Sequence, residues 1–218
     1  TNAAEAAQVC KIVSDLLKRA EPPSIGIACF NLTQRDKILE TLDEMATEDP
    51  DFAARLAVAR SRIGAGAFEG LFVKNLENVQ GDERDHMIIS TTYGPDPQGR
   101  FYRRFGPLGQ VGGGRRLNVL VTRAREEVHL VTSIPPAFYR NLPAVPDGQQ
   151  PGGGWLLFAY LAYAEKLTEV YNEWRSDPSD KPMQSRVISR ETRSPSRFAA
   201  QLAQLMHVRQ NIGSDVHW

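Results

Sequence analysis

The sequence has few cysteines and no long hydrophobic segment, and both shortages limit what the protein can be. Its 218 residues include two cysteines, Cys10 and Cys29, and neither belongs to a Cys-x-x-Cys pair. This pattern favours a reducing, cytoplasmic environment and argues against a structural zinc site. No apolar run approaches the roughly 18–20 residues that span a bilayer, so we expect no membrane partner. The opening TNAAEAAQVCKIV lacks a secretion signal and an initiator Met, so we expect a piece of a longer protein.

The sequence also lacks the residues that would complete a phosphate site or a metal site. No Gly-x-x-x-x-Gly-Lys-Ser/Thr segment occurs, so the P-loop that cradles nucleotide phosphates is missing. Residues 43–46 are similar to a Walker B tetrapeptide, but they lie in an acidic helical stretch and not after an apolar strand. The histidines have no metal-ligand spacing, and we expect this chain to supply no metal ligands. They are His86, His129, His207 and His217.

The net charge is zero, but charges of opposite sign are separated along the chain. The 26 basic residues balance the 26 acidic residues in number. Residues 36–51 hold seven acidic residues and one lysine, whereas residues 100–125 hold seven arginines and no acidic residue. An arginine-rich segment of this kind is suited to binding phosphates, which the overall charge does not reveal.

Apolar periodicity predicts alternating helices and buried strands up to about residue 132. The predicted helices are 3–19, 34–47 (with Thr33 as its cap), 51–62 and 115–125, and the predicted strands are 24–30, 71–73, 87–89 and 128–132. This alternation indicates an α/β fold in which helices cover both faces of a parallel sheet. Ligands of such sheets bind beyond the carboxyl ends of the strands. We therefore expect Gln34, residues 80–85, residues 90–92 and the arginine-rich segment to converge on one edge.

The composition changes after residue 136. Residues 141–154 are rich in proline and glycine and predict a linker, and residues 155–174 predict an amphipathic helix with many aromatic residues. Residues 175–196 are rich in Ser, Pro, Arg and Asp, and we expect them to be mobile. A last short helix is predicted at 198–206.

Four segments carry recognisable signals in a fixed order. They are Asn2-x-x-Glu5-Ala6-x-x-Val9, SIGIACFNLTQRDKI (24–38), VKNLENVQGDERDHMIIS (73–90) and RRLNVLVTRAR (115–125). The first is similar to the helix with which the second helicase motor domain begins. The others are similar to helicase motifs IV, V (with its QGxExD core) and VI. From about Asn2 to Ser133, the chain therefore resembles the second RecA-like motor domain of superfamily 1 helicases. The resemblance is to the group of the nonsense-mediated-decay helicase and its large bacterial relatives.

The resemblance implies the fold of the first part of the chain, and the change in composition after residue 136 indicates how the rest is divided. The fold would be a RecA-like, P-loop NTPase-type three-layer sandwich with a mainly parallel sheet, formed by residues 1–136. Residues 137–154 would be a linker. Residues 155–218 would form a helical extension, leading into a further domain.

The resemblance also implies which residues meet ATP. Arg123 would be the arginine finger at the γ-phosphate and Arg35 its partner from motif IV, with Gln34, Gly81 and Glu83 as further ATP-binding residues. A guanidinium is suited to this task because it stays charged and binds oxygens bidentately. An arginine finger accelerates phosphoryl transfer by factors of about 10³–10⁵. Gly81 would permit close approach of the backbone to a phosphate.

Five more residues would connect the nucleotide to a nucleic acid. Gln80 and Asp85 would order the loop and couple the two sites. Ser90, Thr91 and Thr92 would contact the nucleic-acid backbone, since hydroxyl and main-chain N–H groups bind phosphates without reading bases. For each of these three, a plain role in capping the strand end is an equal alternative.

Two features depart from the family pattern or leave its use open. Motif IV often holds a Pro-Tyr pair whose tyrosine stacks on adenine, but Phe30-Asn31 occupies these positions here. The loop 93–113 contains Phe101, Tyr102 and Phe105 among arginines. Its aromatic residues would either stack on single-stranded nucleic acid or pack internally.

The expected function is that of the C-terminal motor half of an ATP-dependent helicase or translocase on single-stranded DNA or RNA. ATP and Mg²⁺ would be its cofactors, and an N-terminal RecA-like domain of the same protein would supply the P-loop and the Mg²⁺ ligands. The 218 residues alone would then be inactive. The alternative is a non-catalytic nucleic-acid-binding or interaction module that retains the helicase fold. The intact Arg123 and QGxExD argue against it.

Overall fold

A computed structural model describes residues 1–64, 66–79, 81–96, 98–146 and 148–176. The chain divides into two compact units. The first unit consists of Thr1–Pro107 and Arg123–Pro135, and the second of Leu108–Thr122 and the residues from Pro136 onward. The predicted mobile segment 175–196 lies outside the described residues from 177 on, and so does the whole of the predicted helix 198–206.

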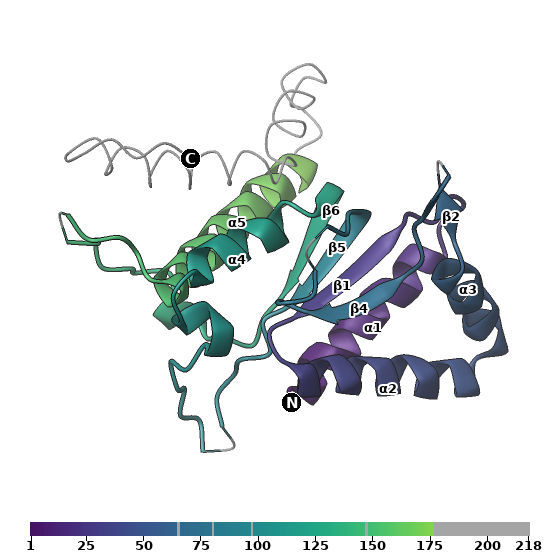
Figure 1. Cartoon of the computed structure of the whole chain (residues 1–218), viewed down its shortest axis with the longest axis horizontal. Helices are drawn as coiled ribbons and strands as arrows, with labels where there is room; N and C mark the ends of the chain where they lie inside the picture. The colour runs from purple at the N-terminus through teal and green to yellow at the C-terminus, as the bar shows by residue number, and fades with distance from the viewer. Residues whose placement is uncertain (65, 80, 97, 147, 177–218) are drawn as a thin grey trace. The chain divides into compact units, whose positions relative to one another are not determined.

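The first unit is built on a four-stranded parallel sheet (Figure 1). Its strands, in spatial order, are β4 (Phe72–Asn75), β1 (Ile25–Cys29), β5 (Arg84–Ser90) and β6 (Ala124–Val131). Each neighbouring pair is parallel, which confirms the predicted α/β class and its mainly parallel sheet. Because β1 lies between β4 and β5, residues 76–83 form a crossover from one end of the sheet to the other.

Three helices cover one face of this sheet (Figure 1). They are α1 (Ala3–Leu17), α2 (Leu32–Glu48) and α3 (Pro50–Arg60). Their apolar residues share one core cluster with strand residues such as Ile27, Ile88 and Val131. Burial of these side chains from the three helices and the sheet holds the two layers together.

Helices α1, α2 and α3 each begin after a polar residue that caps the helix. Asn2 caps α1 by accepting a hydrogen bond from the Glu5 N–H, and Asp49 caps α3 ahead of Pro50. Helix α2 begins earlier than predicted because Asn31 is its N-cap and accepts from the Gln34 N–H at 2.8 Å. The expectation that Thr33 would cap this helix is wrong.

A short hairpin follows α3 and was not predicted. Its strands are β2 (Ile63–Gly64) and β3 (Ala67–Phe68), which pair antiparallel. The side chains of Ile63 and Phe68 are largely exposed to solvent.

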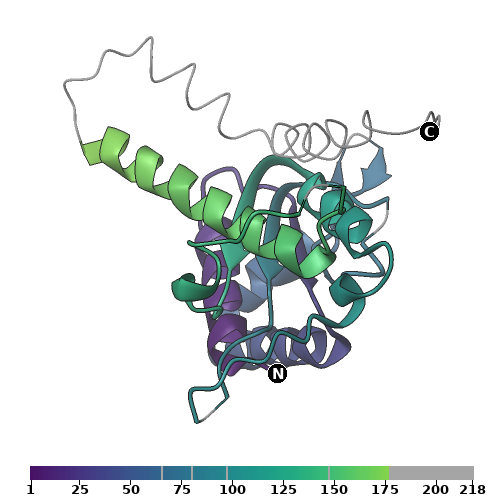
Figure 2. The same ribbon diagram turned by 90° about the vertical axis from the view of Figure 1, so that its left-hand side faces the viewer.

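The second unit contains α4 (Gly113–Val121) and the long helix α5 (Gly153–Ser176), which Figure 2 shows along its length. The two helices pack closely, because a Cβ on Gly114 would lie 2.5 Å from Leu156 Cδ1. A short 3-10 helix spans Pro136–Phe138 in this unit, and another spans Gly106–Gly109, where the first unit passes into the second. Among the described residues, no helix combines the length and hydropathy that crossing a bilayer requires.

The predicted helix 115–125 is wrong at its C-terminal end. Helix α4 ends at Val121, and β6 already begins at Ala124. Arg123 therefore lies between the helix and the strand and not within a helix. Pairing with β5 draws Ala124 into the sheet opposite Arg84.

Candidate functional site

Glu83 and Arg123 meet at the amino ends of the two longest strands. Glu83 directly precedes β5 and Arg123 directly precedes β6. Backbone pairing aligns the two segments, because the Arg84 N–H donates to the Arg123 carbonyl at 3.1 Å. Arg123 Nη1 then donates to Glu83 Oε1 at 3.2 Å. The side chain of Arg123 is 21% exposed and that of Glu83 is 51% exposed, so the pair is accessible from solvent.

Gly81 lies in the same segment and has a backbone that favours glycine. Its φ is +89°, in the left-handed region, and a Cβ placed there would meet nothing within 4 Å. The glycine is therefore required by the backbone conformation and not by lack of space. Its exposed backbone is open to a ligand. Gln80, to which the sequence assigned a coupling role, lies outside the described residues.

Asp85 is fixed by the start of β1. Its Oδ2 accepts hydrogen bonds from Ser24 N–H at 2.9 Å and from Ser24 Oγ at 2.8 Å. Its Oδ1 lies 3.4 Å from Arg125 Nη1. Burial alone would raise the pKa of Asp85, but the hydrogen bonds from Ser24 and the charge of Arg125 outweigh it and lower the pKa.

Two further arginines complete this edge of the sheet. Arg125 also binds Glu69 at 2.6 Å, and the hydrogen bond to Glu69 raises the pKa of Arg125. Arg84 is buried and donates to the Gly70 carbonyl at 2.9 Å, while its guanidinium lies over the Phe72 ring. Burial lowers the pKa of Arg84. These bonds connect the starts of β4, β5 and β6 to one another, next to Arg123.

A buried glutamate organises the opposite edge, and sequence reasoning assigned it no role. Glu5 of α1 is 2% exposed, and its carboxylate accepts from Ser90 Oγ at 2.6 Å, from Thr92 N–H at 2.8 Å and from Ser133 N–H at 2.7 Å. Thr91 Oγ1 and Asn2 Nδ2 add longer bonds, each of 3.2 Å. The Asn2–Glu5 spacing is that of a capping box, which predicts a purely local partner. Instead, Glu5 joins the carboxyl ends of β5 and β6.

The three residues predicted to touch a nucleic acid lie in this network. Ser90 and Thr91 are fully buried and Thr92 is 8% exposed. Thr92 has a φ of +68°, which is strained for a β-branched residue, and its N–H is the one that Glu5 holds. The hydroxyls of Ser90 and Thr91 therefore serve internal contacts here, and a direct contact with nucleic acid stays a prediction.

Gln34 and Arg35 also lie at the carboxyl edge, at the start of α2. Gln34 is fully buried, and its side chain binds the Asn2 N–H at 2.6 Å and the Asn2 carbonyl at 2.9 Å. Arg35 is partly exposed and forms an ion pair with Asp36 at 2.6 Å. Gln34 thus anchors the start of α1 to α2 in this structure.

The expectation that all candidate residues converge on one edge is wrong. Arg123, Glu83, Gly81 and Asp85 lie at the amino ends of the strands, whereas Gln34, Arg35 and residues 90–92 follow the carboxyl ends. The prediction treated residues 80–85 as a strand-end loop, but the crossover 76–83 returns to the starting edge of the sheet. Seven residues of β5 separate the edges, which is about 20 Å at about 3.3 Å per residue.

The aromatic residues of the loop 93–113 differ in their exposure to solvent. Phe105 is 7% exposed and meets the Tyr93 ring edge-on at 5.3 Å between centroids. Tyr93 in turn lies 5.9 Å from Phe30. Tyr102 is 52% exposed, with the Arg100 guanidinium 5.8 Å from its ring. Internal packing therefore holds Phe105, while Tyr102 remains open to a partner.

Comparisons with known proteins identify the family of this chain. A family profile described as an AAA domain matches residues 1–134. An uncharacterized ATP-dependent helicase of Mycoplasma pneumoniae is 36% identical over 174 residues, which is 79% of this chain and 14% of the relative. An uncharacterized ATP-dependent helicase of Mycoplasma genitalium is 37% identical over 151 residues, which is 69% of this chain and 12% of the relative. The chain thus spans a small part of each relative.

The profile covers more than half of the chain and includes both edges of the sheet. The parallel sheet with its flanking helices is the RecA-like α/β fold. Residues 1–134 therefore belong to the AAA domain family, and they are a motor domain of the superfamily 1 helicase type.

Proposed function

We propose that this chain is the C-terminal motor half of an ATP-dependent helicase or translocase acting on single-stranded nucleic acid. ATP and Mg²⁺ would bind between it and a first RecA-like domain of the same protein, which would supply the P-loop and the Mg²⁺ ligands. The motor domain would span residues 1–136, with a linker at 137–154 and a helical extension at 155–218. The buried, unpaired Cys10 and Cys29 support a cytoplasmic location.

The observation that carries this proposal is the Arg123–Glu83 pair. A partly exposed ion pair contributes about 0–1 kcal/mol, so phosphate oxygens can replace Glu83 at Arg123 with little loss. The guanidinium would then offset the charge that develops on the γ-phosphoryl oxygens. Glu83, once released, would face the ribose or the phosphate edge. Gly81 would let the backbone approach the nucleotide.

Arg35 is placed for a role other than that of the arginine finger, which we propose for Arg123. It follows the carboxyl end of β1, about 20 Å from the edge that holds Arg123 by the strand rise. One γ-phosphate does not reach both side chains across that distance. We therefore assign the finger to Arg123 and place Arg35 and Gln34 on the side of the nucleic acid.

The strands that join the two edges would couple ATP binding at one edge to nucleic-acid binding at the other. Asp85 begins β5 beside the ATP-facing pair, and Ser90 ends it within the Glu5 network. In this scheme Ser90–Thr92 position the loop that follows β5, and exposed groups such as Tyr102 meet the single strand. Closure of the two domains on ATP, and release after hydrolysis, would shift the grip on the strand.

The test is a comparison of ATP turnover with and without the first domain. We expect the 218-residue chain alone to show no magnesium-dependent hydrolysis and weak nucleotide binding. Adding the first RecA-like domain of the same protein should produce hydrolysis that single-stranded nucleic acid stimulates. Robust turnover by the chain alone would overturn the proposal. So would a reconstituted pair that binds nucleic acid but hydrolyses nothing, because this is the behaviour of the non-catalytic alternative.

A further inference from the structure

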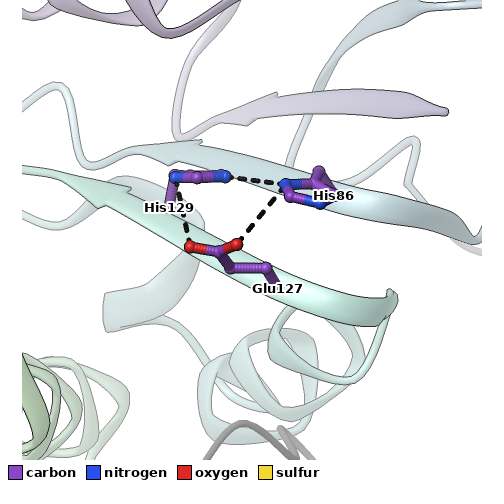
Figure 3. A group of neighbouring side chains, drawn as sticks. All are labelled: His86, Glu127 and His129. Carbon is purple, nitrogen blue, oxygen red and sulfur yellow. Dashed lines mark hydrogen bonds and ion pairs between the residues drawn. The ribbon is translucent and has the colours of Figure 1, made fainter. Parts of the chain in front are cut away.

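Two histidines that lie 43 residues apart in the sequence meet on the helix-covered face of the sheet. His86 of β5 lies in register with Glu127 of β6, and His129 is two residues further along β6. Residues two apart on a strand point to the same face, so all three side chains gather at one point (Figure 3). Their spacing in the sequence gives no sign of this, because strand pairing alone creates the group.

The nitrogen and oxygen atoms of this group lie close together. His86 Nδ1 is 2.9 Å from His129 Nε2, and the rings stack with their centroids 5.2 Å apart. Glu127 Oε2 is 3.8 Å from His86 Nδ1, and its Oε1 is 3.9 Å from His129 Nδ1 (Figure 3). One ligand atom from each residue lies within 4.8 Å of the other two.

The surroundings favour neutral imidazoles. Burial lowers the pKa of His86 and of His129, and the nearby charge of Arg19 adds to this effect. The carboxylates of Glu127, Glu126 and Asp85 act in the opposite direction on His86 without reversing the shift.

We propose that His86, Glu127 and His129 bind a divalent transition metal ion, with Zn²⁺ as the best match and solvent in the fourth position. Two imidazoles and a carboxylate form a common zinc ligand set, and bonds of about 2.0–2.2 Å place tetrahedral ligand atoms about 3.3 Å apart. Two of the observed separations, 2.9 and 3.8 Å, lie on either side of this value, and all three ligand atoms lie within 4.8 Å of one another. Mg²⁺ does not suit this set, because it prefers oxygen ligands.

The accessibility of the group and its outer partner support the proposal. The side chain of His86 is 3% exposed and that of His129 is 19% exposed, whereas Glu127 is 45% exposed and leaves a route from solvent. A histidine that binds a metal through one nitrogen usually offers the other to a carboxylate. His86 Nε2 lies 3.7 Å from Glu126 Oε2, so Glu126 is placed for this role.

A metal ion here would crosslink β5 and β6 next to the candidate ATP site. His86 directly follows Asp85, and Glu127 lies two residues beyond Arg125. The ion would thus fix the two strands just inside the segments that carry Glu83 and Arg123. This site does not depend on the proposed helicase function, because it rests on the strand pairing alone.

The test is a calorimetric titration of the 218-residue chain with ZnCl₂, with MgCl₂ as the control ion. We expect one Zn²⁺ per chain and no heat from Mg²⁺. The Co²⁺ form should show the intense visible absorption of a tetrahedral site. His129→Ala and Glu127→Gln should each weaken Zn²⁺ binding, by at least about 100-fold for the histidine and about 10-fold or more for the glutamate.

The matched control removes the two other histidines. The double variant His207→Ala with His217→Ala should bind Zn²⁺ as tightly as the original chain. Glu127 is nearly half exposed, so Glu127→Gln leaves the fold intact and keeps the test valid if His129→Ala fails to fold. The proposal is overturned if Zn²⁺ does not bind at one per chain. It is also overturned if Glu127→Gln leaves the affinity unchanged, or if the double variant at His207 and His217 loses it.

Discussion

The guanidinium of Arg123 lies 3.2 Å from the carboxylate of Glu83, although 40 residues separate them in the sequence. The parallel pairing of β5 and β6 creates this contact, since Arg84 N–H donates to the Arg123 carbonyl. The contact therefore depends on the sheet and not on either loop alone. A cation held in this way is preorganised for an anionic ligand at the open edge of the sheet.

Arg123→Ala in a protein that contains both proposed motor domains should lower ATP turnover by about 10³-fold or more, because the cation that we propose for the γ-phosphate would be lost. Binding to single-stranded nucleic acid should stay within about threefold, because the contacts that we propose for the nucleic acid lie at the other edge. Steady-state ATPase assays and fluorescence anisotropy would measure the two effects. Arg123→Lys should restore little turnover, because lysine lacks the bidentate geometry.

Arg35→Ala is the matched control for this prediction. Arg35 lies at the opposite edge and pairs with Asp36, so its loss should reduce ATP turnover by less than about tenfold and should weaken nucleic-acid binding. If the two arginine variants lose turnover to the same extent, the assignment of the finger to Arg123 alone is incorrect.

Glu5→Gln should lower the free energy of unfolding by about 3 kcal/mol, because at least one charge-assisted hydrogen bond is lost and a donor is left facing a donor. One carboxylate oxygen accepts from Thr92 N–H and the other from Ser133 N–H. Either orientation of the glutamine amide therefore sets its NH₂ group against a backbone N–H. Urea unfolding of the chain followed by circular dichroism would measure the loss.

The control for Glu5 is Glu40→Gln, which removes an exposed carboxylate paired with Lys37 on α2. An exposed ion pair of this kind contributes about 0–1 kcal/mol, so this variant should unfold almost like the original chain. Equal losses for both variants would show that Glu5 does not hold the ends of β5 and β6.

The order of helices and parallel strands could be predicted from the sequence because it depends on local apolar periodicity. The position of Arg123 could not, because Arg115–Arg125 has a helical composition throughout. The pairing of Ala124 with Arg84 pulls the last residues of that segment into the sheet. Here a tertiary contact overrides local propensity.

The division of the candidate site between two edges has a similar cause. The sequence shows that residues 80–85 follow one strand and precede another, but not which end of the sheet they reach. The insertion of β1 between β4 and β5 decides this, since it makes 76–83 a crossover. The partners of Glu5 and the meeting of His86 with His129 are likewise long-range, and no local pattern encodes them.

Gly81→Ala should lower the free energy of unfolding by about 1–2 kcal/mol, because its φ of +89° is unfavourable for a residue with a Cβ. Gly81→Asn is the matched control, since asparagine tolerates the left-handed region and should lose less than half as much. Nothing lies within 4 Å of the added Cβ, so a steric clash does not contribute. Chemical denaturation would separate the two variants, and equal losses would contradict the backbone explanation.

Asp85 should make stability depend on pH in the acid range. In the folded chain its pKa lies below the ordinary value of 3.8. Burial would raise the pKa, but the hydrogen bonds from Ser24 and the charge of Arg125 outweigh this effect. A group with a depressed folded pKa stabilises the fold fully above its unfolded pKa, and this contribution is lost as the pH falls through the folded value. Asp85→Asn should therefore be less stable than the original chain at pH 7. The difference should shrink below pH 3.8.

The same measurement has an internal control in Asp51→Asn. Asp51 is exposed in the first turn of α3, and its replacement should change the free energy of unfolding by about 0.5 kcal/mol or less at pH 7. Urea unfolding of the three proteins between pH 7 and pH 3 would give the three stability curves. A gap between the original chain and Asp85→Asn that stays constant across this range would mean that the Asp85 carboxylate is not the titrating group. In that case the hydrogen bonds between Ser24 and Asp85 would stabilise the start of β5 without any contribution from the charge of Asp85.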